Sequence, residues 1–465
     1  MEVADYRAPG GPWAAPTLDA RLAERDYRSQ RARVAALAGA LRTAGVTSGD
    51  IVTWQSSNRA EVALAYRACW RLGAVAAPLH HQLGPGETGT LRAQLGPAFA
   101  LDLDALPSGG KPVDECWREP EARAAVLFTS GSSGAPKGVV HTQATLAYKA
   151  FTMVAVHGLT DSDVVLMPAP CAHISGLLNG ITLPGIAGAR TVFMAKWDAE
   201  DALATIERER VTFMVGPPTF FVALMDAPGF AAERVASLRL VSTGGAGVSA
   251  AFVERARSTL GARVKRTYGS TEAPTITTSH AGDDESHDAT HDGRAIGSVE
   301  LRVDGDGELW VRGPEVCVGY LDSAQTAAAF DDDRWFRTGD LATLDGGWLR
   351  IVGRRNDVII RGGENISAAQ VEAVLESHPA VRAAAVVGAP DDRLGEIVCA
   401  FVVTSGSRFD LDACRAWFSE RGVARFKTPE RVFVVDALPL LATGKPDKQR
   451  LHALATSPRG GGRRG

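Results

Sequence analysis

One short stretch of the sequence has the residue types needed to bind an anion. Residues 125–143 read AVLFTSGSSGAPKGVVHTQ, in which an apolar run is followed by hydroxyl residues, glycines and then Lys137. Glycines let backbone N–H groups crowd around an anion, hydroxyls add donors, and a lysine supplies a point charge. The stretch therefore predicts a phosphate-binding loop. A plain Gly/Ser linker is the alternative, and the flanking apolar run and Lys137 argue against it.

The elements on either side indicate how this loop is held. Residues 124–128 are apolar and predict a strand, and apolar residues recur at helical spacing after Thr142. Thr129 to Gly138 is thus expected to be a loop between a strand and a helix. It is not of the Walker A type, because Pro136 stands where the second glycine of that motif is needed. An ordinary P-loop kinase or ATPase is therefore disfavoured.

Length, charge and cysteine content restrict the remaining function classes. A chain of 465 residues is too long for one compact core, so two or more domains are expected. A formal net charge of -4 disfavours nucleic acid or an anionic membrane surface as the main partner. The sequence shows no secretory signal and no membrane span, so we expect a cytoplasmic location. Six scattered cysteines without a C-x-x-C pair favour buried free thiols over disulfides or a zinc site.

The residue pattern changes twice along the chain. Short β-branched runs alternate with helical segments up to about Arg294, which predicts strand-helix-strand units and parallel sheet. Alternating strands with Gly-Gly and Asp-Gly turns follow and predict antiparallel hairpins. From about Gly353 a smaller α+β unit is expected, with Ser367 as the N-cap of a helix.

The expected fold class is therefore α/β. It comprises a large N-terminal domain of parallel and mixed sheets with helices and a small antiparallel, barrel-like part, and a small mobile α+β C-terminal domain. We expect the first domain over residues 1–353, the second over 354–457 with a hinge near 356, and a disordered tail over 458–465.

Seven segments, in this order along the chain, resemble the motifs of the adenylate-forming superfamily, which includes acyl-CoA synthetases, the adenylation domains of peptide synthetases, and luciferases. They are LFTSGSSGAPKGVVHT (127–142), MPAPCAHISG (167–176), STGGA (242–246), YGSTEA (268–273), TGDLA (338–342), GRRNDVIIRGGENIS (353–367) and LATGKPDKQRL (441–451). The resemblance covers essentially the whole chain.

The resemblance implies a two-step reaction. A carboxylate attacks the α-phosphate of ATP to give an acyl-adenylate and pyrophosphate, and the thiol of CoA then displaces AMP. The first step crowds negative charge between the carboxylate and the phosphates, so cations and hydrogen-bond donors must be aimed at that charge.

The same resemblance assigns roles to particular residues. The phosphate binders would be Thr129, Ser130, Gly131, Ser132, Ser133, Gly134 and Lys137, with Thr271 at the α-phosphate. The adenine site would comprise Gly244, Gly245, Ala246, Tyr268 and Gly269, and the ribose hydroxyls would contact Asp340 and Arg354. Glu272 would carry Mg²⁺, and Gly362 and Gly363 would line the pantetheine tunnel of CoA.

Lys445 resembles the mobile catalytic lysine of the superfamily, and His173 the gate beside the carboxylate. Rotation of the small domain about Asn356 would bring Lys445 in for adenylation and remove it for thioester formation. The superfamily usually has Asp or Lys at this hinge position, so Asn356 departs from the pattern. Arg425 and Lys427 are candidate contacts for the phosphates of CoA.

The expected acid is an apolar monocarboxylate. The segments that should line its pocket, 171–178, 216–220 and 241–246, contain no arginine or lysine, whereas a dicarboxylate would need a cation there. The residues of the motifs most resemble those of the superfamily branch that acts on short- and medium-chain fatty acids and on cyclohexanecarboxylate-type ring acids.

We therefore predict an ATP- and Mg²⁺-dependent acid–thiol ligase with a small-molecule acid, ATP and CoA as partners, as a monomer or homodimer. An adenylating enzyme with another acceptor or oxyanion is the alternative: a carrier-protein thiol, an amine, or nitrite. A degenerate nucleotide-binding regulator is a third reading, which the presence of Lys137, Glu272, Asp340 and Lys445 opposes. His287 and His291 could bind a metal if helical, but their polar surroundings favour an exposed loop.

Overall fold

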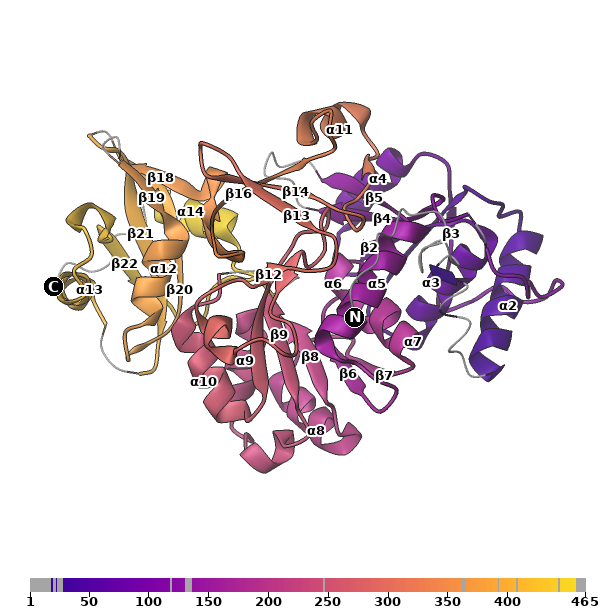
Figure 1. Cartoon of the computed structure of the whole chain (residues 1–465), viewed down its shortest axis with the longest axis horizontal. Helices are drawn as coiled ribbons and strands as arrows, with labels where there is room; N and C mark the ends of the chain where they lie inside the picture. The colour runs from indigo at the N-terminus through magenta and orange to yellow at the C-terminus, as the bar shows by residue number, and fades with distance from the viewer. Residues whose placement is uncertain are drawn as a thin grey trace.

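The protein is described by a computed structural model, which covers residues 18, 19, 22, 28–117, 119–129, 136–245, 247–361, 364–391, 393–406, 409–441 and 444–456. The strands of these residues form three sheets with helices packed against them (Figure 1). The α/β fold class expected from the residue pattern is confirmed.

The first sheet carries the strand that leads into the anion-binding stretch. Its strands, in spatial order, are β15 (Gly319–Tyr320), β5 (Lys137–Thr142), β4 (Arg123–Thr129), β2 (Val75–His80), β1 (Ile51–Ser56) and β3 (Ala98–Ala100). The helices of this region are α2 (Arg28–Thr43), α3 (Ala60–Leu72), α4 (Pro85–Leu95) and α5 (Gln143–His157). β3, β1, β2 and β4 run parallel, and β5 returns antiparallel to β4.

The expected loop over Thr129 to Gly138 is wrong at its C-terminal end. Thr129 lies opposite Lys137 in an antiparallel β4–β5 hairpin, so Lys137 begins a strand instead of standing inside a loop. The buried valines of β5 favour extended backbone, and they cover the same core as β4. The helix expected after Thr142 is confirmed, because Thr142 Oγ1 caps α5 by accepting from Thr145 N at 3.2 Å.

The second sheet joins parallel and antiparallel parts. Its order is β13 (Glu300–Val303), β14 (Glu308–Arg312), β16 (Phe336–Asp345), β17 (Trp348–Arg354), β12 (Arg294–Ala295), β11 (Thr277–Thr278), β10 (Arg263–Tyr268), β9 (Leu240–Gly244), β8 (Phe213–Gly216), β6 (Val164–Met167) and β7 (Arg190–Phe193). β6 to β10 are parallel, and the hairpins expected after Arg294 continue the same sheet through β12 and β11.

Helices cover this second sheet and the space beside it. They are α6 (Ile174–Leu177), a π-helical turn (Leu178–Thr182), α7 (Leu183–Ala187), α8 (Ala199–Glu209), α9 (Pro218–Met225), α10 (Ala250–Leu260) and α11 (Ser323–Ala329). Short 3₁₀ turns occur at Ala232–Val235 and Glu285–Ala289. α8, α9 and α10 pack their apolar faces into one core with the strands β8 and β9.

The third sheet belongs to the C-terminal part of the chain. Its strands are β19 (Glu364–Ser367), β18 (Val358–Arg361), β21 (Gly395–Thr404) and β20 (Val381–Asp391), and β22 (Arg431–Val434) pairs with β21. Its helices are α12 (Ala368–Glu376), α13 (Leu411–Glu420) and α14 (Lys448–Thr456), with 3₁₀ turns at Arg355–Asp357 and Arg425–Lys427. The N-cap expected at Ser367 is confirmed, because its hydroxyl accepts from Gln370 N.

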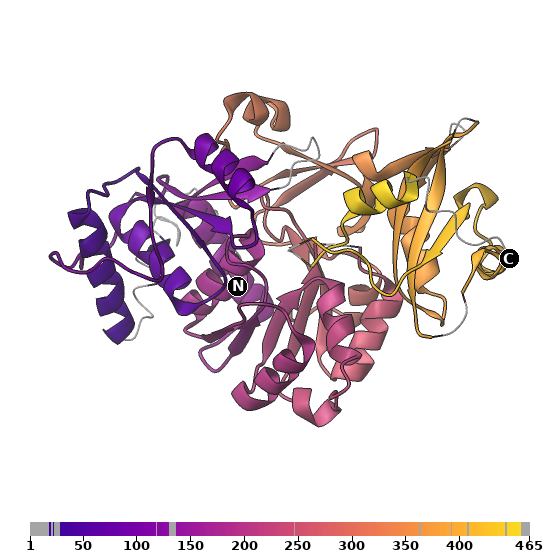
Figure 2. The ribbon, with the colours of Figure 1, turned by 180° about the vertical axis from the view of Figure 1, so that it is seen from behind.

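The C-terminal sheet lies to one side of the larger N-terminal part, and from behind, the chain that leads into α14 reaches back between the two (Figures 1 and 2). The domain limits 1–353 and 354–457 stay predictions, as does the mobility of the smaller unit, and the tail 458–465 lies outside the described residues.

All six cysteines are free thiols, as expected, and only Cys116 is partly exposed. Among the described residues, none of the helices is long and apolar enough to cross a membrane.

Candidate active site

Three predicted nucleotide-binding residues lie in contact around one carboxylate. Asp340, on β16, is buried, and its Oδ1 accepts from Arg354 Nε at 2.9 Å while its Oδ2 accepts from the Tyr268 hydroxyl at 2.5 Å. Burial and the neighbouring Asp340 charge raise the pKa of Tyr268, so the phenol keeps its proton as a donor. Each carboxylate oxygen has a further lone pair, so Asp340 can still accept from two hydroxyl groups of a ligand.

The loop after β10 places Thr271 and Glu272 beside this carboxylate. Gly269 allows its tight turn, since a Cβ there would lie 2.2 Å from Thr275 N. His141 Nε2 donates to the Thr271 carbonyl at 2.8 Å, which ties the loop to β5 of the first sheet. Burial lowers the pKa of His141 to about 4, so the ring is neutral at pH 7. The loop is thus anchored to the first sheet through the Thr271 carbonyl, and this bond does not use the Thr271 side chain.

Glu272 is connected to Lys137 through one aromatic ring. The Tyr320 hydroxyl donates to Glu272 Oε1 at 2.8 Å, and Lys137 Nζ lies 5.2 Å from the centre of the same ring. Lys137 stands opposite Thr129 at the connected end of the β4–β5 hairpin. The structure therefore brings the predicted phosphate lysine and the predicted metal carboxylate to one place.

Lys445 reaches this cluster from the C-terminal part of the chain. A Cβ at Gly245 would lie 2.9 Å from Lys445 Cε, so the lysine runs directly across that glycine. Burial lowers the pKa of Lys445 to about 8, aided by the Arg354 charge, while Asp340 and Glu272 act in the opposite direction. The ammonium group therefore lies among the residues predicted to bind the nucleotide.

The loop that carries Lys445 is attached to α9. Thr219 Oγ1 donates to the Gly444 carbonyl at 2.7 Å. A Cβ at Gly444 would lie 2.7 Å from the Phe220 ring, which itself stacks on Trp197 with the ring centres 4.4 Å apart. Gly444 has a φ of +82°, a conformation that glycine adopts without strain. The lysine loop is thus both hydrogen-bonded and packed against the large N-terminal part.

His173 stands at the start of α6, and Asn58 fixes the segment before it. Asn58 Nδ2 donates to the Ala169 carbonyl at 2.7 Å, and its Oδ1 accepts from Cys171 N at 2.8 Å. Burial lowers the pKa of His173 to about 3, and the Lys445 charge adds to the effect. His173 is therefore a neutral ring at pH 7, which can donate or accept a hydrogen bond but supplies no charge.

Some predicted residues have other neighbours than a ligand. Gly244 is required by strand packing, since a Cβ there would lie 2.0 Å from the Thr267 carbonyl oxygen on β10. His287 stacks on Trp348 with ring centres 4.0 Å apart. Among the described residues, no three or more His, Cys, Asp or Glu side chains come together in a way that could hold a metal ion. The predicted residues Ser130, Gly131, Ser132, Ser133, Gly134, Ala246, Gly362 and Gly363 lie outside the described residues.

The predicted hinge position lies between anchors to the two parts of the chain. Arg355 Nη1 donates to Glu308 Oε2 at 2.9 Å in the second sheet. On the other side, Asp357 pairs with Lys448 of α14 at 3.2 Å. Residue 356 thus falls where the chain passes from one unit to the other, and its function as a hinge stays a prediction.

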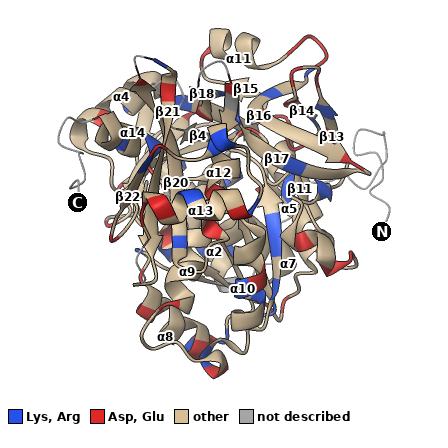
Figure 3. Cartoon of the chain, turned by 90° about the vertical axis from the view of Figure 1, so that its left-hand side faces the viewer, with Lys and Arg blue, Asp and Glu red and all other residues tan. Residues whose placement is uncertain are grey.

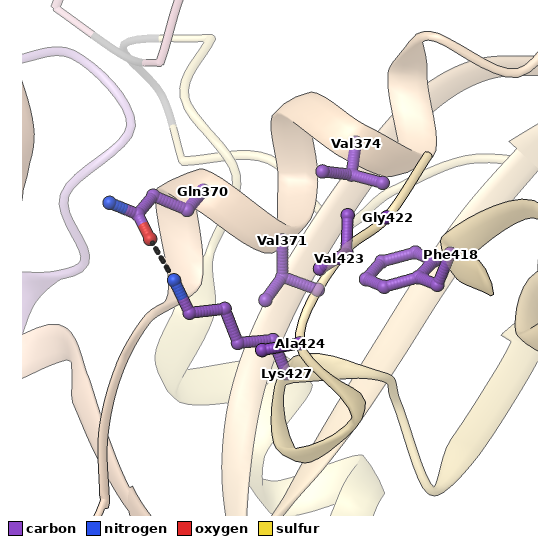
Figure 4. Close-up of a pocket in the computed structure, with 8 residues that line it drawn as sticks. All are labelled: Gln370, Val371, Val374, Phe418, Gly422, Val423, Ala424 and Lys427. Atoms are coloured by element: carbon purple, nitrogen blue, oxygen red, sulfur yellow. Dashed lines mark hydrogen bonds between the residues drawn. The ribbon is translucent and has the colours of Figure 1, made fainter. Parts of the chain in front are cut away.

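Arg425 and Lys427 lie in the 3₁₀ turn after α13, and Lys427 lines a pocket of about 280 Å³ (Figure 4). Val371, Val374 and Phe418 give this pocket an apolar wall, and Lys427 Nζ donates to Gln370 Oε1 at 3.0 Å along one side. Basic and acidic residues are interspersed over this side of the molecule (Figure 3).

Sequence reasoning missed three residues that the structure places beside the site. They are Tyr320, Thr219 and His80. Tyr320 belongs to the run VCVGYL, and Thr219 to GPPTF, which was assigned only to the acid pocket. The histidine pair 80–81 follows the apolar run VAAPL, for which no strand was predicted; His80 ends the parallel strand β2, and ligands bind at the carboxyl ends of such strands.

Comparison with known proteins identifies the family. The pattern of the AMP-binding enzyme family matches residues 15–107 and 91–321, and that of the AMP-binding enzyme C-terminal domain matches residues 370–445. The medium-chain fatty-acid–CoA ligase of Escherichia coli K12 is 33% identical over 89% of this chain and 82% of that protein. The indoleacetate–CoA ligase of Aromatoleum aromaticum is 33% identical over 93% of this chain and 94% of that protein.

A solved structure shows the same architecture. The o-succinylbenzoate CoA synthetase of Bacillus subtilis, in complex with its acyl-adenylate intermediate, superposes with a TM-score of 0.79 at 30% identity and covers 91% of each chain. The protein is thus an adenylate-forming enzyme by family and by fold. It belongs to the AMP-binding enzyme family and, within it, to the AMP-forming acid–CoA ligases.

Proposed function

We propose that this enzyme activates an apolar monocarboxylic acid, such as a medium-chain or ring acid, as its acyl-adenylate and transfers the acyl group to CoA. The observation that carries the proposal is the position of Lys445 among Asp340, Arg354 and Glu272. A cation at this place opposes the repulsion between an incoming carboxylate and the α-phosphate.

In this proposal the binding residues orient ATP so that its α-phosphate faces the acid. Asp340 accepts from the ribose hydroxyls, with Arg354 and Tyr268 holding the carboxylate in place. Lys137 and Thr129 bind the outer phosphates from the connected end of their hairpin. The neutral His173 closes the site beside the carboxylate and helps to exclude water.

The side chain of Glu272 fits a magnesium ion. Mg²⁺ prefers carboxylate and phosphate oxygens and would neutralise phosphate charge when bound. Glu272 Oε1 accepts from Tyr320, which orients the carboxylate and leaves its second oxygen for a metal. Tyr320 is held in turn by the short β15 strand against β5. Glu272 would therefore supply the ligand of the metal that accompanies ATP.

The proposed acid class rests on the segments expected to line the acid pocket. Within them, Phe220 stacks on Trp197, and buried Cys171 and Ala172 precede the His173 gate. These groups offer apolar contact and no fixed cation for a second carboxylate. Two ligases reported above, named for a medium-chain fatty acid and for indoleacetate, also support an acid with an apolar body.

For the second step we propose that the small domain turns about residue 356 and withdraws Lys445. Lys427, which lines the pocket in Figure 4, and Arg425 of the same 3₁₀ turn would then meet the phosphates of CoA. The Lys427–Gln370 bond is exposed, so exchanging it for a phosphate contact costs little.

The function is tested with a panel of acids. Octanoate, cyclohexanecarboxylate and indoleacetate are compared with malonate and succinate, with and without CoA, and AMP and pyrophosphate are measured. We expect CoA-dependent AMP formation with the apolar acids and at least about tenfold less with the dicarboxylates. Pyrophosphate exchange that is indifferent to CoA would point to another acceptor, and ADP as the only product would refute the proposal.

The pH dependence of adenylation should follow the charge of Lys445. The pKa of this group is lowered from its usual 10.5 to about 8, so the charged form is present below that pH and the neutral amine above it. We therefore expect kcat/KM for acid-dependent pyrophosphate exchange to fall above about pH 8. Lys445→Arg, which stays charged, should move this decline upward, and a wild-type profile that stays flat to about pH 9.5 would contradict the assignment.

The Thr219 hydroxyl should speed up adenylation and leave the rate of thioester formation unchanged. Thr219→Val removes the donor to the Gly444 carbonyl but keeps the side-chain shape, so we expect adenylation to slow by about 3- to 10-fold, as for one neutral hydrogen bond. Thr219→Ser keeps the hydroxyl and should remain near the wild type. Thioester formation from supplied acyl-adenylate is the control, and an equal loss in this step would show that Thr219 merely stabilises the fold.

A further inference from the structure

Two histidines outside the assigned site lie against His173. His80 ends β2, and its ring centre is 5.3 Å from that of His173. His81 stacks on His80 with the ring centres 4.5 Å apart. His80 is only 8% exposed, so its polar atoms are nearly removed from water. None of the roles assigned above uses this pair.

The hydrogen bonds of His80 fix where its proton lies. His80 Nδ1 is 3.1 Å from the backbone nitrogen of Gln82. A backbone N–H can only donate, so Nδ1 accepts and carries no proton. Burial, together with His81, lowers the pKa of His80 to about 4, so the ring is neutral and its single proton sits on Nε2.

This Nε2–H group is buried and has no acceptor among the described residues. A buried donor without a partner is rare in folded proteins, because it loses its bond to water and gains none in return. A bound molecule that supplies an acceptor would remove the penalty. The vacant donor is therefore a candidate ligand contact.

The position of β2 indicates which ligand atoms come near. β2 runs parallel to β4 with Ala76 opposite Ala125, so both strands end at one edge of the sheet. His80 ends one of them, and Thr129 ends the other, at the connected end of the β4–β5 hairpin. On its other side His80 contacts His173, the predicted gate beside the carboxylate. His80 thus lies between the place of the acid and that of the outer phosphates.

We propose that His80 Nε2–H is an additional binding group, which donates a hydrogen bond to an anionic oxygen of the bound ligand. The acceptor belongs to the carboxylate of the acid or to pyrophosphate, and both are oxyanions with free lone pairs. The inference rests on the proposed function and adds a residue to its site. Because the donor is neutral, it binds an oxyanion without adding charge to the cluster around Lys445.

Two substitutions of His80 distinguish the role of its Nδ1 acceptor from that of its Nε2–H donor. In His80→Asn the amide oxygen can replace Nδ1 as acceptor for Gln82 N–H, while the Nε2 donor is lost. In His80→Gln the amide nitrogen replaces Nε2 as donor. The KM of the acid is measured by AMP formation, the KM of pyrophosphate by ATP formation from acyl-adenylate, and folding by the thermal unfolding midpoint.

We expect His80→Asn to raise one of these KM values about tenfold, and His80→Gln to restore most of it, as for a hydrogen bond to a charged acceptor. A rise for the acid identifies the carboxylate as acceptor, and a rise for pyrophosphate identifies the leaving group. If both KM values stay within about twofold of the wild type, or change alike in both variants, the proposal is wrong.

A measurement on the unaltered protein covers the case in which a variant does not fold. In ¹⁵N-histidine spectra of the full chain, the Nε2–H signal of His80 should move downfield when octanoate or pyrophosphate is added. A signal that moves with neither ligand refutes the proposal. If wild-type protein forms no AMP with any acid, the proposed function fails instead, and the pyrophosphate titration alone decides the role of His80.

Discussion

Replacing Lys445 with alanine should abolish adenylation and leave the second half-reaction intact. The ammonium group lies among Asp340, Arg354 and Glu272, where charge develops as the carboxylate meets the α-phosphate. Removing one preorganised donor of this kind typically costs about 3 to 4 kcal/mol in the transition state, or about 10²- to 10³-fold in rate. We expect a loss of this size in acid-dependent pyrophosphate exchange.

The second half-reaction is the control within the same variant. Thioester formation from supplied acyl-adenylate and CoA should proceed at close to the wild-type rate, because Lys445 is withdrawn at that stage in the proposed cycle. Lys111→Ala, at an exposed lysine remote from the site, is the matched control and should change neither step. Equal losses in both half-reactions would assign Lys445 to folding or to a shared contact, against the proposed role.

The site could be predicted from sequence wherever a short motif carries both the residue type and its surroundings. Asp340 and Arg354 belong to different motifs, yet the resemblance predicted both at the ribose. In the structure they lie on the paired strands β16 and β17, with Arg354 Nε 2.9 Å from Asp340 Oδ1. Likewise, Ser367 was predictable as an N-cap because a cap depends on a few residues close in sequence. Local rules sufficed in these cases.

Contacts across long stretches of chain could not be predicted in this way. Thr219 and Gly444 are 225 residues apart, and only the docking of the C-terminal unit on α9 brings them together. His80 ends β2 of the first sheet, whereas His173 lies 93 positions later at the start of α6, so only the tertiary fold brings their rings together. The strand β5 was missed because its pairing with β4 depends on a partner strand, whereas periodicity within six residues cannot separate a strand from a loop.

We expect the largest loss of stability from breaking a buried ion pair that contacts the Thr271–Glu272 loop. Lys149, on α5, lies 2.9 Å from Glu315, and both side chains are fully buried. Lys149 Nζ also donates to the Thr275 carbonyl at 2.9 Å, at a residue whose φ of +41° is unusual for a non-glycine. The lysine thus couples α5 to the loop that carries two predicted catalytic residues.

Lys149→Met should lower the free energy of unfolding by about 3 to 5 kcal/mol, because it leaves the Glu315 charge buried without its counter-ion. Adding Glu315→Leu should recover most of this loss, since an apolar pair of similar volume carries no desolvation cost. Urea unfolding followed by tryptophan fluorescence measures Lys149→Met, Glu315→Leu and the double variant, with Lys111→Met as the control at an exposed site.

The double-mutant cycle decides how the pair acts. If the double variant is less destabilised than the two single variants together, the two charges are coupled and the penalty belongs to the orphaned carboxylate. Strict additivity would mean that each residue contributes only its own packing. Adenylation by the double variant should stay below the wild type even where stability returns, because methionine cannot donate to the Thr275 carbonyl and the loop loses that anchor.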